Sequence, residues 1–168
     1  MKYFADCKTA EDAKALYREL AKKYHPDLHP GENTEEMMKA INNEFERAWE
    51  RLKDVHTSKD GGTYEAQGER RTHETAAEFM GIIVALLSLD GVTVELCGRW
   101  IWVSGNTLPH KNRLSALGCK WASAKKMWSW HKVEDATASR GKYSIDQIRD
   151  FYGSQVCERQ EESRLALA

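Results

Sequence analysis

The sequence predicts an α+β fold, in which an N-terminal helical hairpin is followed by a small ββαββ-type domain flanked by helices. In the first third of the chain, apolar residues recur at intervals of three and four in two segments, which is typical of amphipathic helices. Further on, short runs of β-branched and aromatic residues alternate with glycine and polar turns, which is typical of a small antiparallel sheet. The length of 168 residues suffices for two small domains.

The first helix is expected to begin after Thr9, a good N-cap residue, with Glu11 and Asp12 favouring the helix dipole in its first turn. Pro26 must end this helix, because the residue before a proline is disfavoured in the α conformation. The apolar stripe of this helix consists of Ala13, Leu16, Tyr17, Leu20 and Tyr24.

The second helix is expected to begin at Thr34, after a loop over residues 25–33 that contains two prolines and one glycine. Two antiparallel helices joined by such a loop form a helical hairpin. The apolar stripe of the second helix consists of Met38, Ile41, Phe45, Ala48, Trp49 and Leu52.

Residues 55–71 are polar and are predicted to be a linker between a first domain over residues 1–54 and a second domain over residues 72–156. A third helix is expected from Glu74 to Leu89. Then come two strands around Gly98, a short helix, a second strand pair and a last helix, at Val92–Cys97, Arg99–Ser104, Pro109–Leu117, Cys119–Ala122, Met127–His131 and Tyr143–Tyr152. Residues 157–168 are expected to be a frayed tail.

Charge is unevenly distributed, although the formal net charge is only −1. A basic block within an otherwise acidic chain indicates an anionic partner for that block. Between Leu96 and Val133 there is no Asp or Glu, and the seven basic residues are Arg99, Lys111, Arg113, Lys120, Lys125, Lys126 and Lys132.

The cysteines are scattered without a Cys-x-x-Cys pair, and the N-terminus lacks the pattern of a secretion signal, so we expect reduced thiols and a cytoplasmic location. The longest apolar run, residues 79–89, is too short to span a bilayer, and no membrane partner is expected. The four cysteines are Cys7, Cys97, Cys119 and Cys157.

The stretch Ala15–Asp27, which ends in His25-Pro26-Asp27, resembles the second helix and the invariant tripeptide of the J-domain family. Ala48–Asp54 resembles the end of the family's third helix. The resemblance implies a DnaK-type chaperone as partner and stimulation of its ATP hydrolysis, with Asp27 as a charge contact and His25 positioning the loop. The resemblance is to a minimal J-domain, because only Met1–Lys8 remain for the family's first helix and its basic fourth helix is not evident.

Lys14, Arg18 and Lys22 are four residues apart and share one helix face, with Lys23 beside them. We expect this basic face to lie opposite the apolar stripe and to steer the hairpin onto an acidic chaperone surface. Pro26 stiffens the loop and lowers the ordering cost of binding. The alternative is that the basic face is merely solvated and that His25-Pro26-Asp27 is an ordinary helix terminator.

Five of the six tryptophans lie in the basic block, where aromatic and basic side chains on a small sheet can stack bases and neutralise phosphates. The same residues could instead bind a protein partner or simply fill the core of a small domain. The candidate binding residues are Arg99, Trp100, Trp102, Lys111, Arg113, Lys120, Lys125, Lys126, Trp128 and Trp130.

Residues 74–156 also resemble a module of short J-domain proteins of Gram-positive bacteria and their phages or mobile elements. The resemblance depends on Gly105–Lys111, Leu117–Trp121, Lys126–Trp128 and Ile148–Ser154.

No P-loop, nucleophile elbow or paired-carboxylate motif is present, so no enzyme activity and no cofactor is expected. Cys119, His131 and His110 lack the tight spacing of a zinc site, so no metal is expected either. With the resemblance to the J-domain family, the chain is predicted to be a co-chaperone that stimulates a DnaK-type ATPase and carries a targeting domain for nucleic acid or a protein partner. The alternative is a phage or mobile-element nucleic-acid-binding protein whose J-like hairpin is only structural.

Overall fold

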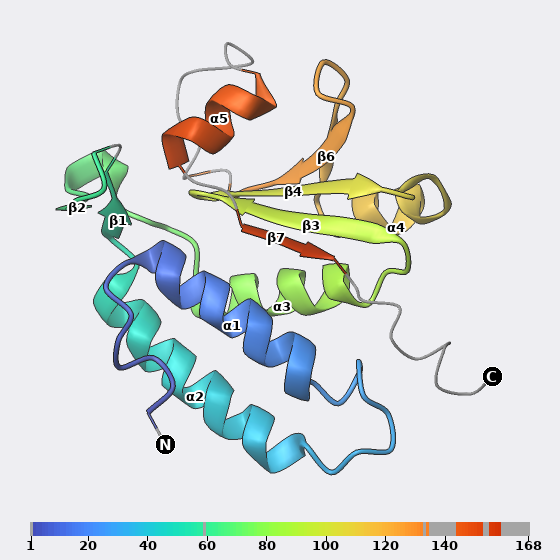
Figure 1. Ribbon diagram of the computed structural model, residues 1–168, viewed down its shortest axis with the longest axis horizontal. Coiled ribbons are helices and arrows are strands. Elements are labelled where there is room, and N and C mark those ends of the chain that lie inside the picture. Colours follow the sequence, from blue (N-terminus) through green and yellow to red (C-terminus); the bar gives the residue numbers. More distant parts are fainter. Residues whose placement is uncertain (1, 59, 133, 135–143, 153–154, 159–168) are drawn as a thin grey trace.

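The computed structural model describes residues 2–58, 60–132, 134, 144–152 and 155–158. Helices α1 (Ala10–Tyr24) and α2 (Glu35–Leu52) form an antiparallel hairpin, and α3 (Ala76–Leu87) lies between this hairpin and a sheet (Figure 1). The α+β prediction and both helices of the hairpin are confirmed.

The sheet is antiparallel and has the strand order β5-β6-β4-β3-β7. The segment β3-β4-α4-β5-β6 reproduces the predicted ββαββ pattern, and a 3-10 turn, η2 (Leu108–His110), precedes α4. The elements are β3 (Val92–Cys97), β4 (Trp100–Gly105), α4 (Lys111–Ala116), β5 (Lys120–Ala122), β6 (Met127–Trp130), α5 (Ile145–Tyr152) and β7 (Gln155–Glu158).

Local sequence explains where these elements begin and turn. The Thr9 hydroxyl accepts a hydrogen bond from the Asp12 N–H (3.1 Å), and the Asp12 carboxylate accepts one from the Thr9 N–H (3.1 Å), which is a capping box. Gly105 has a φ of +85°, and a Cβ there would lie 2.7 Å from the carbonyl oxygen of Gly91. A side chain at this end of the β3–β4 pair would therefore be strained.

One continuous core joins the hairpin, α3 and the sheet. Tyr17, Phe45 and Phe79, from α1, α2 and α3, have ring centroids 4.6–6.0 Å apart. The other side of α3 packs on the face of the sheet that carries Val94 and Ile101. On the opposite face a smaller cluster of Cys97, Trp102 and Met127 is covered by Ile145 and Ile148 of α5.

The segment 55–71 is structured, in contrast to the predicted linker. It contains the hairpin of β1 (Val55–Thr57) and β2 (Thr63–Glu65) and a 3-10 turn, η1 (Gly68–Arg70). Asp54 holds the end of this segment, because its carboxylate accepts from the Thr72 N–H (2.7 Å) and from Arg71 Nε (3.0 Å). Polar composition alone does not show such long-range hydrogen bonds, and this is why the segment resembled a linker.

Both ends of the chain add to the fold. Phe4 is buried 5.6 Å from the ring of Phe45, and the Tyr3 N–H donates to Glu44 (2.6 Å), so both residues attach the segment before α1 to α2. The prediction of a frayed tail is wrong for Cys157 and Glu158, because β7 pairs with β3. The rest of that tail, residues 159–168, lies outside the described residues.

Candidate functional site

The His25-Pro26-Asp27 loop is a compact turn at the end of α1. The His25 N–H makes the last helical hydrogen bond, to the carbonyl of Ala21 (2.8 Å). The carbonyl of His25 then accepts from the N–H groups of Leu28 (3.0 Å) and His29 (3.1 Å). His29 Nε2 donates to the carbonyl of Lys22 (2.6 Å) and so ties the loop back to the helix.

Within this turn, His25 and Asp27 have different environments. The side chain of His25 is 18% exposed, whereas that of Asp27 is 76% exposed. His25 Nδ1 accepts a hydrogen bond from the Asp27 N–H (3.2 Å). Burial lowers the pKa of His25 and the charge of Asp27 only partly opposes this, so the imidazole is neutral at neutral pH and can keep accepting that hydrogen bond. His25 thus shapes the backbone, and Asp27 presents a carboxylate to solvent.

The expectation that Lys14 and Arg18 lie on an accessible basic face is wrong, because each is only 3% exposed. Lys14 Nζ lies 2.5 Å from a carboxylate oxygen of Glu74, which is also buried. The same ammonium lies 5.3 Å and 5.0 Å from the ring centroids of Trp49 and Phe79. The physical reason is the position of α3 and the residues before it, which cover this side of α1.

The positive charge that remains accessible on α1 is at its C-terminal end, next to the loop. Lys23 is exposed and Lys22 is partly exposed. Arg18 Nη2 lies 3.3 Å from the carboxylate of Glu19, at the edge of the buried region. The structure therefore places Lys22 and Lys23 in the last turn of α1, which leads into the loop with Asp27, and it places Lys14 and Arg18 in the interior.

The tryptophans do not form one platform, because the strand register places them on opposite faces of the sheet. Trp102 pairs with Ser129, whereas Val103 pairs with Trp128 and Ile101 with Trp130. Paired residues share a face. Trp100 and Trp102 stack together on the α5 side (5.6 Å between centroids), and Trp128 and Trp130 pack toward the main core. Each pair shares a face as predicted, but the two pairs lie on opposite faces of the sheet.

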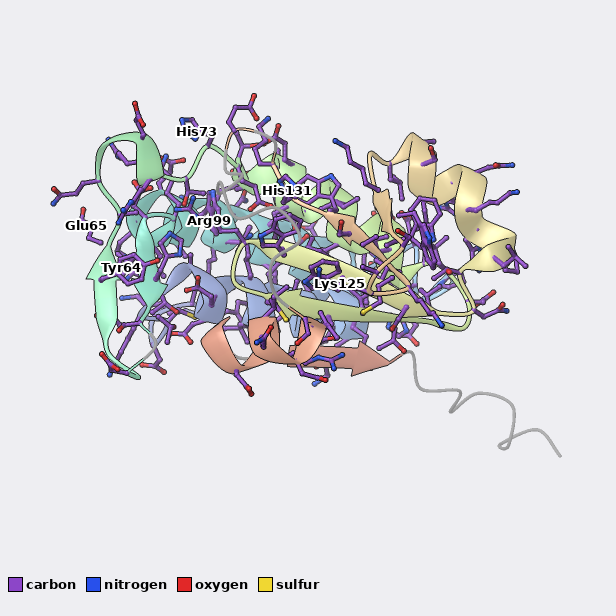
Figure 2. All side chains as sticks on the ribbon, turned by 90° about the horizontal axis from the view of Figure 1, so that it is seen from above. Tyr64, Glu65, His73, Arg99, Lys125 and His131 are labelled. Carbon is purple, nitrogen blue, oxygen red and sulfur yellow. The ribbon has the colours of Figure 1, made fainter. Side chains whose placement is uncertain are left out.

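On the α5 side, the candidate groups are engaged by the protein itself. Trp102 is buried, the ring of Trp100 lies 4.0 Å from that of His131, and Lys125 Nζ lies 5.7 Å from the ring centroid of Trp102. Arg99 donates to the carbonyl of Arg70 and lies 3.3 Å from His56. Figure 2 looks onto this side, with Arg99, Lys125 and His131 labelled.

Among the side chains of the module that the structure describes, Trp121 is the exposed aromatic one, and it was not among the candidate binding residues. It lies on the edge strand β5 and is 50% exposed, with its ring centroid 5.7 Å from that of Trp128. The short β5–β6 hairpin could have indicated that Trp121 is exposed, because a three-residue strand at the edge of a sheet cannot bury both of its faces. Lys120, Lys126, Lys111 and Arg113 are exposed in the same part of the module.

The described residues contain no group of three or more His, Cys, Asp or Glu side chains placed to hold a metal ion. Cys7, Cys97 and Cys119 are buried and form no disulfide, and burial raises the pKa of Cys119 to about 11. Its thiol is therefore protonated at neutral pH, unlike an activated nucleophile. No helix within the described ranges is long and apolar enough to cross a membrane.

Part of the chain is similar to proteins of the DnaJ type. Over 72 residues it is 35% identical to the chaperone protein DnaJ of Hydrogenobacter thermophilus, a match that covers 43% of this chain and 19% of that protein. Over 60 residues it is 43% identical to a curved DNA-binding protein of Coxiella burnetii, covering 36% and 17%. Over 58 residues it is 38% identical to DnaJ of Lactiplantibacillus plantarum, covering 34% and 15%.

The chain thus spans less than a fifth of the length of these curated relatives. These partial matches support a relationship to the J-domain family. They give no support for the second resemblance, that of the tryptophan-rich module. No protein-family model and no solved structure matches the chain.

Proposed function

We propose that this chain is a J-domain co-chaperone that binds a DnaK-type chaperone and stimulates its ATP hydrolysis through His25-Pro26-Asp27. The observation that carries this proposal is the protruding carboxylate of Asp27, 76% exposed on a turn fixed by hydrogen bonds. A preordered loop loses little conformational entropy on binding, and its charge contact forms without rearrangement. Partial identity to two DnaJ chaperones supports the choice of partner.

The docking surface that we propose is smaller than the one expected from sequence. Lys22, Lys23 and Asp27 would meet the chaperone, whereas Lys14 and Arg18 would support the helix from inside. Lys22 and Lys23 also stand in the last turn of α1, where a positive charge is favourable to the helix dipole. They can therefore attract an acidic surface without destabilising their own helix.

The tryptophan-rich module is proposed to direct this activity to a nucleic acid or a protein partner, in the cytoplasm where its chaperone would be found. The second candidate function is that of a phage or mobile-element nucleic-acid-binding protein whose hairpin is only structural. One observation favours it: the face with Lys14 and Arg18 is used to pack α1 against its own chain.

A single-turnover ATPase assay with a DnaK-type chaperone decides between the two. The chain should accelerate ATP hydrolysis, and Asp27→Asn should reduce the acceleration at least tenfold, because one charge-assisted contact of about 1.5–3 kcal/mol is lost. Asp60→Asn is the matched control, since Asp60 is an exposed aspartate in the β1–β2 loop. Absence of stimulation by the unaltered chain, or equal stimulation by both variants, would contradict the co-chaperone proposal.

A further inference from the structure

The free edge of the sheet at β5 combines an exposed aromatic ring with positive charge. In the strand order, β5 is terminal, and in the described part of the chain it pairs only with β6. We call Lys120, Trp121 and Lys126 the Trp121 surface. Lys120 and Trp121 are consecutive residues of β5, so their side chains leave the edge on opposite faces. Lys126 lies in the turn between β5 and β6.

The ring of Trp121 is held by its neighbour but is not covered by it. The ring of Trp128, which is half-buried against the main core, meets it edge-on, at an interplanar angle of 64°. Such a contact fixes the orientation of Trp121 and still leaves half of the side chain accessible. Trp100, Trp102 and Trp130 have lower exposure and stabilise the fold instead.

The stretch of sequence that carries this ring has charge of one sign. Residues 96–133 contain no acidic residue, and Lys120 and Lys126 are both exposed. On α4, which leads through Gly118 directly into β5, Lys111 and Arg113 are exposed as well. A partner that extends along this edge would therefore meet positive charge at several points and no negative charge from this stretch.

We propose that the Trp121 surface binds single-stranded nucleic acid, with an unpaired base stacked on Trp121 and neighbouring phosphates at Lys120 and Lys126. An aromatic ring can stack on the face of a base only where the base is unpaired and accessible, whereas a duplex hides these faces. Lysines at separate points along the edge suit a chain of regularly spaced phosphates. This inference rests on the targeting role proposed for the module and specifies its ligand and its residues.

The test is the anisotropy of a fluorescein-labelled 20-nucleotide oligodeoxythymidylate, titrated with the full chain at several salt concentrations. Trp121→Ala should weaken binding roughly tenfold, and Trp121→Phe should retain most of the affinity because a ring remains. Lys120→Gln with Lys126→Gln should reduce the slope of log K against log salt by about 1.4, or about 0.7 for each lost phosphate contact. A duplex of equal length should bind more weakly than the single strand.

Two matched controls accompany these variants. Tyr64→Ala removes an aromatic residue of nearly equal exposure, 49%, from β2, and Lys8→Gln with Lys39→Gln removes two exposed lysines elsewhere. Neither should change binding by more than about twofold, and far-UV circular dichroism shows whether Trp121→Ala keeps the fold. If Trp121→Ala does not fold, the double lysine variant and the comparison of single strand with duplex still test the inference.

The inference would be overturned by the absence of oligonucleotide binding, by an equal loss in the Tyr64→Ala control, or by preference for the duplex. Binding of polyglutamate in place of the oligonucleotide would also overturn it and would indicate an acidic protein partner. No chaperone is present in this assay. Its failure therefore leaves the result of the ATPase assay with Asp27→Asn unaffected, and the two proposals fail separately.

Discussion

Lys14 shows how one residue can change its role when a further helix is added to a helical hairpin. Its ammonium is buried between Glu74 and the rings of Trp49 and Phe79, and Trp49 Nε1 donates to the carbonyl of Glu74 (2.9 Å). Burying two charges is costly, and their attraction compensates only when both partners are present. The pair therefore fixes where α3 begins relative to α1.

Lys14→Ala is expected to lower the free energy of unfolding by about 3 kcal/mol, because it leaves the Glu74 carboxylate buried without its ammonium partner. Urea unfolding measures this effect. The double variant Lys14→Met with Glu74→Leu should recover most of the loss, since it replaces both charges by apolar side chains of similar size. If Lys14→Ala changed chaperone stimulation without changing stability, Lys14 would be a docking residue after all.

At the scale of elements, the β1–β2 hairpin is attached to α1 by a short polar chain. His56 of β1 is buried, and its Nδ1 donates to the Glu11 carboxylate (2.8 Å), which also accepts from the Thr57 N–H (3.3 Å). Burial would raise the pKa of Glu11, but these hydrogen bonds and the charge of His56 outweigh it and lower the pKa overall. The carboxylate form of Glu11 is thus stabilised by folding.

Because the pKa of Glu11 is lower in the folded chain than in the unfolded chain, this stabilisation is present above the ordinary glutamate pKa of about 4.3 and is lost as the pH falls below it. Glu11→Gln should therefore lower stability at pH 7 and flatten the decline of unfolding free energy between pH 5 and pH 3. Urea unfolding across this range measures both effects. Glu69→Gln, an exposed control in η1, should retain the full decline. An unchanged pH profile in Glu11→Gln would contradict the assignment.

The elements themselves were largely predictable from sequence, and their contacts were less so. The capping residue, the proline and the glycine predicted the bounds of α1 and of the β3–β4 pair to within one or two residues, because these signals are local. The burial of Lys14, the order inside residues 55–71 and the opposite faces of Trp102 and Trp128 depend on partners far along the chain. Helical spacing shows that Lys14 and Arg18 share a face, but it does not show what covers that face.

At the scale of the whole molecule, the two proposed binding regions are well separated. Figure 1 shows the loop between α1 and α2 and the turn that leads into β6 on opposite sides, with α3 and the sheet between them. A chaperone at Asp27 and a nucleic acid strand at Trp121 could therefore be bound at the same time. The continuous core connects the two regions, since α3 packs on α1, α2 and β3.

This shared core predicts that the hairpin and the sheet unfold together. Phe79 of α3 is fully buried, with ring centroids 5.6 Å from Phe45 and 6.0 Å from Tyr17. Phe79→Ala should lower stability by about 3–5 kcal/mol. It should shift the urea midpoint equally in far-UV circular dichroism, which reports mainly helices, and in tryptophan fluorescence, to which the five tryptophans of the module contribute most.

Met37→Ala, at an exposed position of α2, should change stability by less than about 0.5 kcal/mol. Two separate midpoints would instead mean that residues 1–54 form an independent domain, and α3 would then belong to the sheet alone.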